Sequence, residues 1–371
     1  MTIIDAARSV RAAAAAAVDD MESNCRLSPD LAATFATAGL MRMLSPVGLG
    51  AAQAHPADFV DAVAEVSAAN GSAGWCVMIS ATTSLMAGWM DEPGATEVYG
   101  NPDGVWAGAY APSGVGRIEG DAIVVDGRWA WGSGCENADW FSGGTLCDDG
   151  SFRLCCVPAE EVTIHRDWDV VGMRGTGSHD WSVSGAVVPR SRSIELVGLV
   201  PVAPGPLYRM PLFGVLAAGV AATGIGIGRA ALDEIISLAT EKTPTTHSRR
   251  LAERDSVQSE IARRAVQLAA ANSHLRAELT AAFDAAAAGV TATSADRARL
   301  RSASTHAAHA GLEVTTACFT LAGGTSVRNS SPLARLVRDA HVVTQHMMTS
   351  AATYEPAGRA LLGAELGPFD L

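Results

Sequence analysis

Four long segments at the end of the chain constrain its fold more than any other feature. Small and apolar residues recur at helical spacing over about 212–241, 248–287, 294–321 and 332–362. The last segment begins at Ser331-Pro332, a capping residue followed by proline, which is the usual order at a helix start. Helices of this length bury their apolar faces against one another, so the pattern predicts a closing four-helix bundle.

The first of these segments needs a separate interpretation because it contains an uncharged stretch. Residues 210–228 carry no charge over 19 positions, but five of them are glycine and few are large and apolar. This composition favours a buried, closely packed helix over a membrane span. The run Gly224-Ile-Gly-Ile-Gly228 lies inside the helical pattern and does not follow a strand, so it indicates helix packing rather than a dinucleotide loop.

The sequence before this region changes character twice. The first hundred residues have helical patterns, whereas 105–189 consists of short β-rich runs between turn residues, including a hairpin over 118–127. Pro201, Pro204 and Pro206 then indicate a linker. We predict an α+β protein with an N-terminal helical domain (1–100), a central β-barrel or sandwich domain (101–205) and the four-helix bundle (206–371).

Charge and cysteine content narrow the partners. The chain has 27 Lys and Arg against 39 Asp and Glu, a formal net charge of −12, which disfavours nucleic acid and anionic membranes. Its seven cysteines include no CxxC pair, and the N-terminus has no apolar signal-peptide core. We therefore expect a cytoplasmic protein that binds neither nucleic acid nor membranes.

Three segments carry a resemblance to a known family. They read DGRWAWGSGCENADW at 126–140, WDVVGMRGTGS at 168–178, and LAGG followed by PLARLVRDA at 321–324 and 332–340. In this order and spacing they resemble the acyl-CoA dehydrogenase superfamily. The resemblance implies that superfamily's fold, a bound flavin and a homotetramer, because the fold places its flavin at subunit contacts.

The departures from that family change the expected chemistry. Acyl-CoA dehydrogenases remove a proton with a carboxylate, but this chain has no Asp or Glu between Asp339 and Glu355, and none between Glu195 and Asp233. His346 lies in the first of these gaps. This pattern resembles the two-component flavin-dependent monooxygenases of the same fold. Those enzymes take reduced FMN or FAD from a separate flavin reductase and use O₂ to hydroxylate phenols, other aromatics, sulfur heterocycles or amino sugars.

The monooxygenase resemblance implies roles for individual residues. Ser133 would hydrogen-bond the flavin N5, and His346 would handle the proton of a flavin peroxide or of the substrate. The other expected cofactor-binding residues are Tyr110, Ser113, Trp131, Trp168, Arg249, Gly323 and Gly324. The expected substrate-binding residues are Trp75, Met78, Thr82 and Met347, whose apolar surroundings suit a hydrophobic, aromatic substrate.

Plainer interpretations remain open for several residues. Ser133 is also consistent with a turn serine, His346 with an ordinary helix histidine, and Arg249 with a solvated basic face. Ser178-His179-Asp180 contains triad residue types, but consecutive residues cannot converge as a triad does. His306 and His309 share a helix face without a third metal ligand. Two rival functions also remain: a dehydrogenase or oxidase with an unusual base, and a non-catalytic binding module of the same fold.

Overall fold

The N-terminal part of the chain is helical. The computed structural model describes residues 1–244 and 248–367. The helices before the sheet are α1 (Ile3–Ala16), α2 (Val18–Asn24), α3 (Pro29–Thr37), α4 (Pro56–Ala69), α5 (Gly71–Ser84) and α6 (Glu92–Tyr99). Capping explains several of their starts. Ser28 accepts a hydrogen bond from Leu31 N–H at α3, and Asn70 accepts one from Ala73 N–H at α5.

The strands form one open sheet. They are β1 (Trp106–Glu119), β2 (Ala122–Gly132), β3 (Trp140–Cys147), β4 (Phe152–Pro158), β5 (Thr163–His165), β6 (His179–Pro189) and β7 (Ser193–Glu195), in the order β5-β6-β2-β1-β3-β4-β7. The predicted hairpin is present, with Ile118 paired to Ile123. The prediction of a barrel is wrong for the described residues, because β5 and β7 end the sheet without pairing to each other.

A tryptophan pair forms the core of this sheet. Trp129 and Trp181 stack with their ring centroids 4.3 Å apart. Gly127 and Gly143 face Trp129 so closely that an added Cβ would lie 2.6 Å and 2.7 Å from its ring. Glycine inside these strands therefore makes room for the large rings.

Long helices follow the sheet. They are α7 (Leu212–Glu241), α8 (Asp255–Ala287), α9 (Ser294–Ala322), α10 (Pro332–Val343) and α11 (Tyr354–Leu361). Small residues bring α7 and α9 together, since a Cβ on Gly311 would lie 2.2 Å from the Gly224 carbonyl oxygen. By length and composition α7 qualifies as a possible membrane span, but 89% of its apolar window is buried inside this molecule.

The prediction of one continuous fourth helix over 332–362 is wrong. Helix α10 ends at Val343, and residues 344–350 form turns before a short 3₁₀ segment, Ala351–Thr353, leads into α11. The backbone N–H of His346 still donates to Val343 O at 3.3 Å, so the break is a tightening of the chain rather than an extended loop. This turn segment, 344–350, carries His346.

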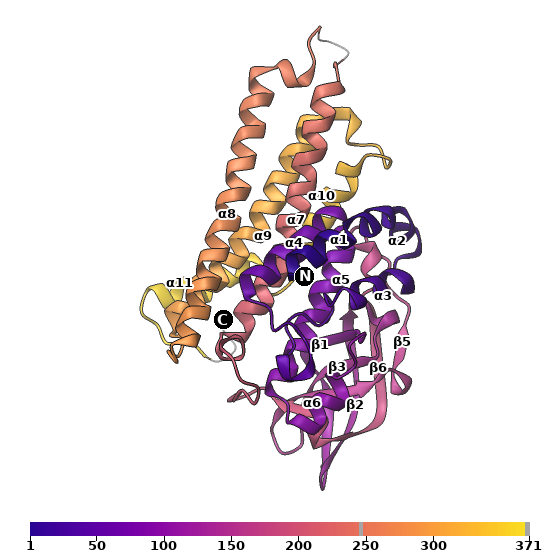
Figure 1. The fold of residues 1–371 in the computed structure, drawn as a ribbon, viewed down its shortest axis with the longest axis vertical. Helices are drawn as coiled ribbons and strands as arrows, with labels where there is room; N and C mark the ends of the chain where they lie inside the picture. The colour runs from indigo at the N-terminus through magenta and orange to yellow at the C-terminus, as the bar shows by residue number, and fades with distance from the viewer. Residues whose placement is uncertain (245–247, 368–371) are drawn as a thin grey trace.

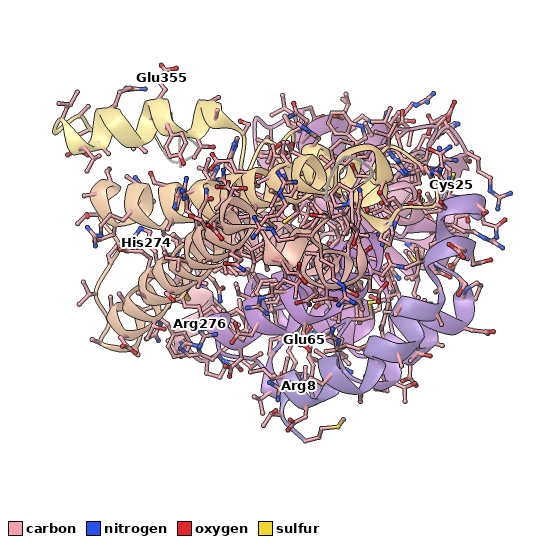
Figure 2. The ribbon with its side chains drawn as sticks, turned by 90° about the horizontal axis from the view of Figure 1, so that it is seen from above. Arg8, Cys25, Glu65, His274, Arg276 and Glu355 are labelled. Carbon is pink, nitrogen blue, oxygen red and sulfur yellow. The ribbon has the colours of Figure 1, made fainter. Side chains whose placement is uncertain are left out.

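The N-terminal helices connect the sheet to the long C-terminal helices. Figure 1 shows the sheet at one end of the molecule, the N-terminal helices in the middle and α7, α8 and α9 running side by side away from them. Helix α5 packs against both β1 and α7, and Ser80 on α5 accepts a hydrogen bond from Trp106 N–H at 3.2 Å. Arg276 of α8 forms an ion pair with Asp61 of α4, on the side where Figure 2 labels Arg276 and Glu65.

Candidate active site

Ser133 is turned into the protein by an irregularity at the end of β2. The register with β6 shifts between Trp129 and Gly132, and Trp131 adopts φ +65°. A large residue in the left-handed region costs about 1–3 kcal/mol. As a result Trp131 is 73% exposed, while the next hydroxyl residue, Ser133, is only 5% exposed. Backbone strain of this kind clusters at functional sites.

Ser133 begins a chain of buried hydroxyl groups. Its Oγ accepts a hydrogen bond from Trp75 Nε1 at 2.9 Å and lies 2.7 Å from Ser178 Oγ. Ser178 Oγ is in turn 2.7 Å from Thr176 Oγ1, which donates to Met173 O at 2.8 Å. We call Ser133, Ser178 and Thr176 the hydroxyl chain.

His346, in the turn segment that follows α10, contacts the same tryptophan. Its ring meets Trp75 edge-on, with the centroids 5.4 Å apart and the planes at 71°. Met348 N–H donates to His346 Nδ1 at 3.3 Å, so a neutral imidazole carries its proton on Nε2. Burial, followed by the charge of Arg301, lowers the pKa of His346 from 6.5 to about 4. The imidazole is therefore neutral near pH 7, with Nε2–H as a donor.

Asp339 on α10 ties this helix to the turn that carries the hydroxyl chain. Its carboxylate is 1% exposed, accepts from Met173 N–H at 2.6 Å and pairs with Arg335 at 3.4 Å. Met173 has φ +53°, so the carboxylate holds a strained residue in place. Burial raises the pKa of Asp339 from 3.8 to about 6. Sequence reasoning missed this contact, although Asp339 belongs to the quoted motif at 332–340.

Asp339 and His346 have opposite effects on the pH dependence of stability. Between about pH 4 and 6 folded Asp339 keeps a proton that the unfolded chain has lost, so its contribution to stability rises as the pH falls. Over the same range unfolded His346 binds a proton that the folded chain excludes, so its contribution falls. In the wild type the two contributions therefore oppose each other.

Substituting either residue should reveal the contribution of the other. We expect Asp339→Asn to make the free energy of unfolding fall, relative to wild type, as the pH is lowered from about 6 to 4. His346→Gln should make it rise over the same range. Urea unfolding at three pH values in this range measures both slopes. Parallel slopes for all three proteins would contradict the opposed shifts.

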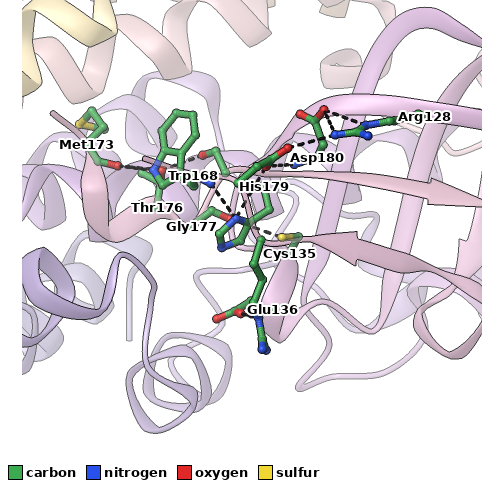
Figure 3. Close-up of polar contacts among 12 residues, drawn as sticks. Arg128, Cys135, Glu136, Trp168, Met173, Thr176, Gly177, His179 and Asp180 are labelled. Atoms are coloured by element: carbon green, nitrogen blue, oxygen red, sulfur yellow. Dashed lines mark hydrogen bonds and ion pairs between the residues drawn. The ribbon is translucent and has the colours of Figure 1, made fainter. Parts of the chain in front are cut away.

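Trp168 lies on the segment between β5 and the hydroxyl chain, as Figure 3 shows. Its indole N–H donates to Met173 O at 3.2 Å, and its backbone N–H donates to His179 Nδ1 at 3.1 Å. Burial lowers the pKa of His179, which keeps Nδ1 free to accept. Trp168 and Thr176 therefore share the Met173 carbonyl as an acceptor.

The residues of the supposed triad have separate partners. Ser178 contacts Ser133, His179 accepts from Trp168 N–H, and Asp180 pairs with Arg128. Their side chains thus stabilise three different contacts. His309 is also accounted for, because its Nε2 lies 3.1 Å from the Thr349 carbonyl oxygen.

The residues expected to line the substrate site are distributed unevenly. Thr82 bonds its own helix through Met78 O at 2.8 Å, and its carbonyl accepts from the Tyr110 hydroxyl at 3.3 Å. Met78 packs against Gly219 of α7, where an added Cβ would lie 2.8 Å from its side chain. Ser113 is exposed, and Met347 is 72% exposed. Trp75 alone among the expected substrate residues contacts both Ser133 and His346.

The remaining expected cofactor residues lie at the other end of the long helices. Arg249 borders a cavity of about 370 Å³ that is also lined by Ser248, Arg254, Asp255 and Ser256. Gly323 and Gly324 are exposed at the end of α9, which Lys242 joins to α7 by donating to Ala322 O at 2.6 Å. Within one chain this end lies away from the sheet that carries Ser133 (Figure 1).

Among the described residues, Asp339, Glu355 and the buried thiols of Cys76 and Cys135 add no further reactive group to the site. Asp339 is occupied by its two partners, and Glu355 on α11 projects away from the molecule in Figure 2. Burial raises the pKa of Cys76 and Cys135 to about 12, so both thiols are inert near neutral pH. Across 1–244 and 248–367, no three His, Cys, Asp or Glu side chains are grouped to hold a metal ion.

Comparisons with known proteins identify the family of the chain. A family model described as the acyl-CoA dehydrogenase C-terminal domain matches residues 218–351. The chain is 33% identical over 355 residues to the indole-3-acetate monooxygenase of Pseudomonas putida, covering 94% of this chain and 91% of the relative. It is 28% identical to the flavin-dependent monooxygenase oxygenase subunit HsaA of Rhodococcus jostii, covering 86% and 87%.

A solved structure extends the likeness to the whole fold. The crystal structure of 3-HSA hydroxylase from Rhodococcus sp. RHA1 superposes with a TM-score of 0.93 at 25% identity, covering 100% of this chain and 99% of that one. The fold is that of the acyl-CoA dehydrogenases. The chain belongs to the flavin-dependent monooxygenases built on that fold, as the monooxygenase resemblance of its motifs predicted.

Proposed function

We propose that this chain is the oxygenase component of a two-component system. In this proposal it takes reduced FMN or FAD from a separate flavin reductase, uses O₂ and hydroxylates a hydrophobic, aromatic small molecule. The relative named as an oxygenase subunit supports a separate reductase. The relative named for indole-3-acetate supports an aromatic substrate. The observation that carries the proposal is the direction of the hydrogen bonds in the hydroxyl chain.

That direction follows from counting protons. Thr176 has one hydroxyl proton and uses it to donate a hydrogen bond to the Met173 carbonyl oxygen, which can only accept. Ser178 must therefore donate to Thr176, and Ser133 must donate to Ser178. Because Trp75 Nε1 donates to Ser133, the serine keeps one lone pair and no proton for a ligand. A bound group that presents an N–H fits this acceptor, and a group that presents only a lone pair does not.

Reduced flavin meets that requirement, because N5 carries a hydrogen in the reduced form and none in the oxidised form. When bound, reduced flavin would supply the electrons that activate O₂. Ser133 Oγ would accept a hydrogen bond from N5–H. The exposed ring of Trp131 and the segment that carries Trp168 would contact the flavin ring system. His346 would present its Nε2–H beside Trp75 and donate to the reacting oxygen. Burial of the hydroxyl chain and of Trp75 would keep water away.

The function is tested by mixing the protein with reduced flavin anaerobically and then adding O₂ in a stopped-flow spectrometer. We expect a long-lived absorbance that belongs to neither reduced nor oxidised flavin. Adding an aromatic substrate should convert it to hydroxylated product. Immediate appearance of oxidised flavin and hydrogen peroxide, with and without substrate, would refute the proposal.

The hydroxyl chain yields a separate prediction. Ser178→Ala removes the acceptor to which Ser133 donates, so Ser133 regains a proton for oxidised flavin. We expect the ratio of the dissociation constants for oxidised and reduced flavin to fall by roughly three- to tenfold, the worth of one neutral hydrogen bond. Anaerobic titrations measure the ratio. Ser182→Ala is the control, since Ser182 lies on β6, the strand that directly follows Ser178, but contacts His165. A ratio unchanged in Ser178→Ala would count against the direction inferred here.

We also propose the finer architecture and assembly implied by the resemblance. The domains would be 1–100, 101–205 and 206–371, with a four-helix bundle in the last, in a cytoplasmic homotetramer. Arg249, Gly323 and Gly324 would then contact flavin held mainly by a neighbouring copy, which accounts for their distance from Ser133 within one chain. Light scattering coupled to gel filtration measures the oligomeric state.

A further inference from the structure

Arg301 on α9 is a buried cation without an anion. Only 6% of its surface is exposed, and among the described residues it forms no ion pair. Its Nη1 donates to the Met348 sulfur at 3.2 Å and its Nη2 donates to Met348 O at 3.2 Å. Its Nε–H is buried and has no partner. A thioether is a weak acceptor, so most of this guanidinium is poorly satisfied.

This arrangement contrasts with that of two less deeply buried arginines. Arg335 pairs with Asp339, and Arg264 pairs with Glu260. Arg42, the other buried arginine of the described residues, also has an unpartnered Nε–H, and burial lowers its pKa. It donates to Leu49 O, however, and the charge of Asp103 opposes the lowering of its pKa. For Arg301 burial is the sole influence, and it lowers the pKa to about 10. The side chain therefore stays charged at neutral pH, although burying an unpaired charge is unfavourable.

The position of Arg301 connects it to the proposed active site. Its hydrogen-bonding partner among the described residues, Met348, lies two residues after His346 in the turn segment 344–350. Burial is the main cause of the lowered pKa of His346, and the charge of Arg301 adds to it, so the two side chains lie near each other. An anion paired with Arg301 would thus lie beside the imidazole that also contacts Trp75.

We propose that Arg301 binds the carboxylate of the substrate, and hence that the substrate is an aromatic acid. The inference rests on the proposed hydroxylase function. The unpartnered Nε–H and a neighbouring N–H form the planar fork that matches a carboxylate with two parallel hydrogen bonds. The carboxylate supplies the missing anion, and the aromatic ring extends toward Trp75 and His346.

The test is equilibrium binding to the full-length protein without flavin, measured by calorimetry. The probes are two matched pairs, indole-3-acetate with indole-3-acetamide and phenylacetate with phenylacetamide. We expect the wild type to bind at least one acid roughly tenfold or more tightly than its amide, because hydrogen bonds to a charged acceptor are the stronger ones. Arg301→Gln should abolish that preference, and Arg301→Lys should retain part of it.

Control variants separate binding from folding. Arg299→Gln removes an exposed arginine of the same helix and should keep the acid preference. Arg301→Met should melt no lower than the wild type, because it removes an unpaired buried charge. The proposal is overturned if neither pair favours the acid, or if folded Arg301→Gln still favours it. Failure of the hydroxylase function would show instead in the substrate-free reaction of reduced flavin with O₂.

Discussion

Replacing His346 by alanine will lower the rate of substrate hydroxylation by about 10²–10⁴-fold, the range for a positioned proton donor. The neutral imidazole has Nδ1 occupied by Met348 N–H and therefore offers Nε2–H beside Trp75. Without that donor, flavin oxidation should continue while oxygen is released as hydrogen peroxide. Product and peroxide measured together give the loss and its cause.

Two variants sharpen this prediction. His346→Gln keeps an N–H near the position of Nε2 and should retain more hydroxylation than His346→Ala. His341→Ala removes an exposed histidine near the end of α10, shortly before the turn segment that carries His346, and should leave the rate unchanged. Equal hydroxylation by His346→Ala and wild type would rule out the assignment of His346.

Replacing Asp339 by alanine will lower the free energy of unfolding by about 3–5 kcal/mol, as expected when one partner of a buried ion pair is removed. The variant leaves Met173 N–H and the Arg335 guanidinium without their acceptor. Met173 is held at a positive φ by this bond, so the turn that begins the hydroxyl chain should loosen as well. Urea unfolding measures the loss, and protection of the Thr176 amide from hydrogen exchange reports the turn.

Asp339→Asn is the informative comparison, because an amide oxygen still accepts from Met173 N–H while the charge is gone. It should lose much less stability than Asp339→Ala. Asp284→Ala, on the exposed face of α8, should change stability by no more than about 0.5 kcal/mol. A loss of that same small size in Asp339→Ala would show that Asp339 does not hold the turn.

Local patterns predicted much of the fold because the information lies within short windows. The boundaries of α7 and α9 follow helical spacing, and the hairpin of β1 and β2 follows its Gly-Asp turn. The break after Val343 was not predictable in this way, since 344–350 contains neither proline nor glycine and its apolar spacing continues. Sheet closure was also beyond reach, because it depends on pairing between the distant strands β5 and β7.

The sequence indicated individual residues of the candidate site, but not the long-range contacts between them. Motif resemblance singled out Ser133 and His346, yet nothing local indicates that Trp75, 58 residues before Ser133, contacts both of them. The same holds for Asp339, whose partner Met173 is 166 residues away, and for Arg301, whose lack of an anion is a property of the folded interior. Burial and pairing arise only when distant segments meet.

In the proposed site, the hydroxyl chain would limit how strongly the protein discriminates between reduced and oxidised flavin. Its three protons must rotate together, so the serine is either an acceptor or a donor, with no intermediate setting. Reversing the direction of all three hydroxyl groups removes the hydrogen bond that Thr176 donates to the Met173 carbonyl oxygen. Trp168 Nε1 still donates to that oxygen. Inversion therefore costs about 0.5–1.5 kcal/mol, one neutral hydrogen bond. This cost is a small penalty on the binding of oxidised flavin. The oxidised form would therefore remain bound briefly and then leave, which suits a cofactor that is exchanged at every turnover.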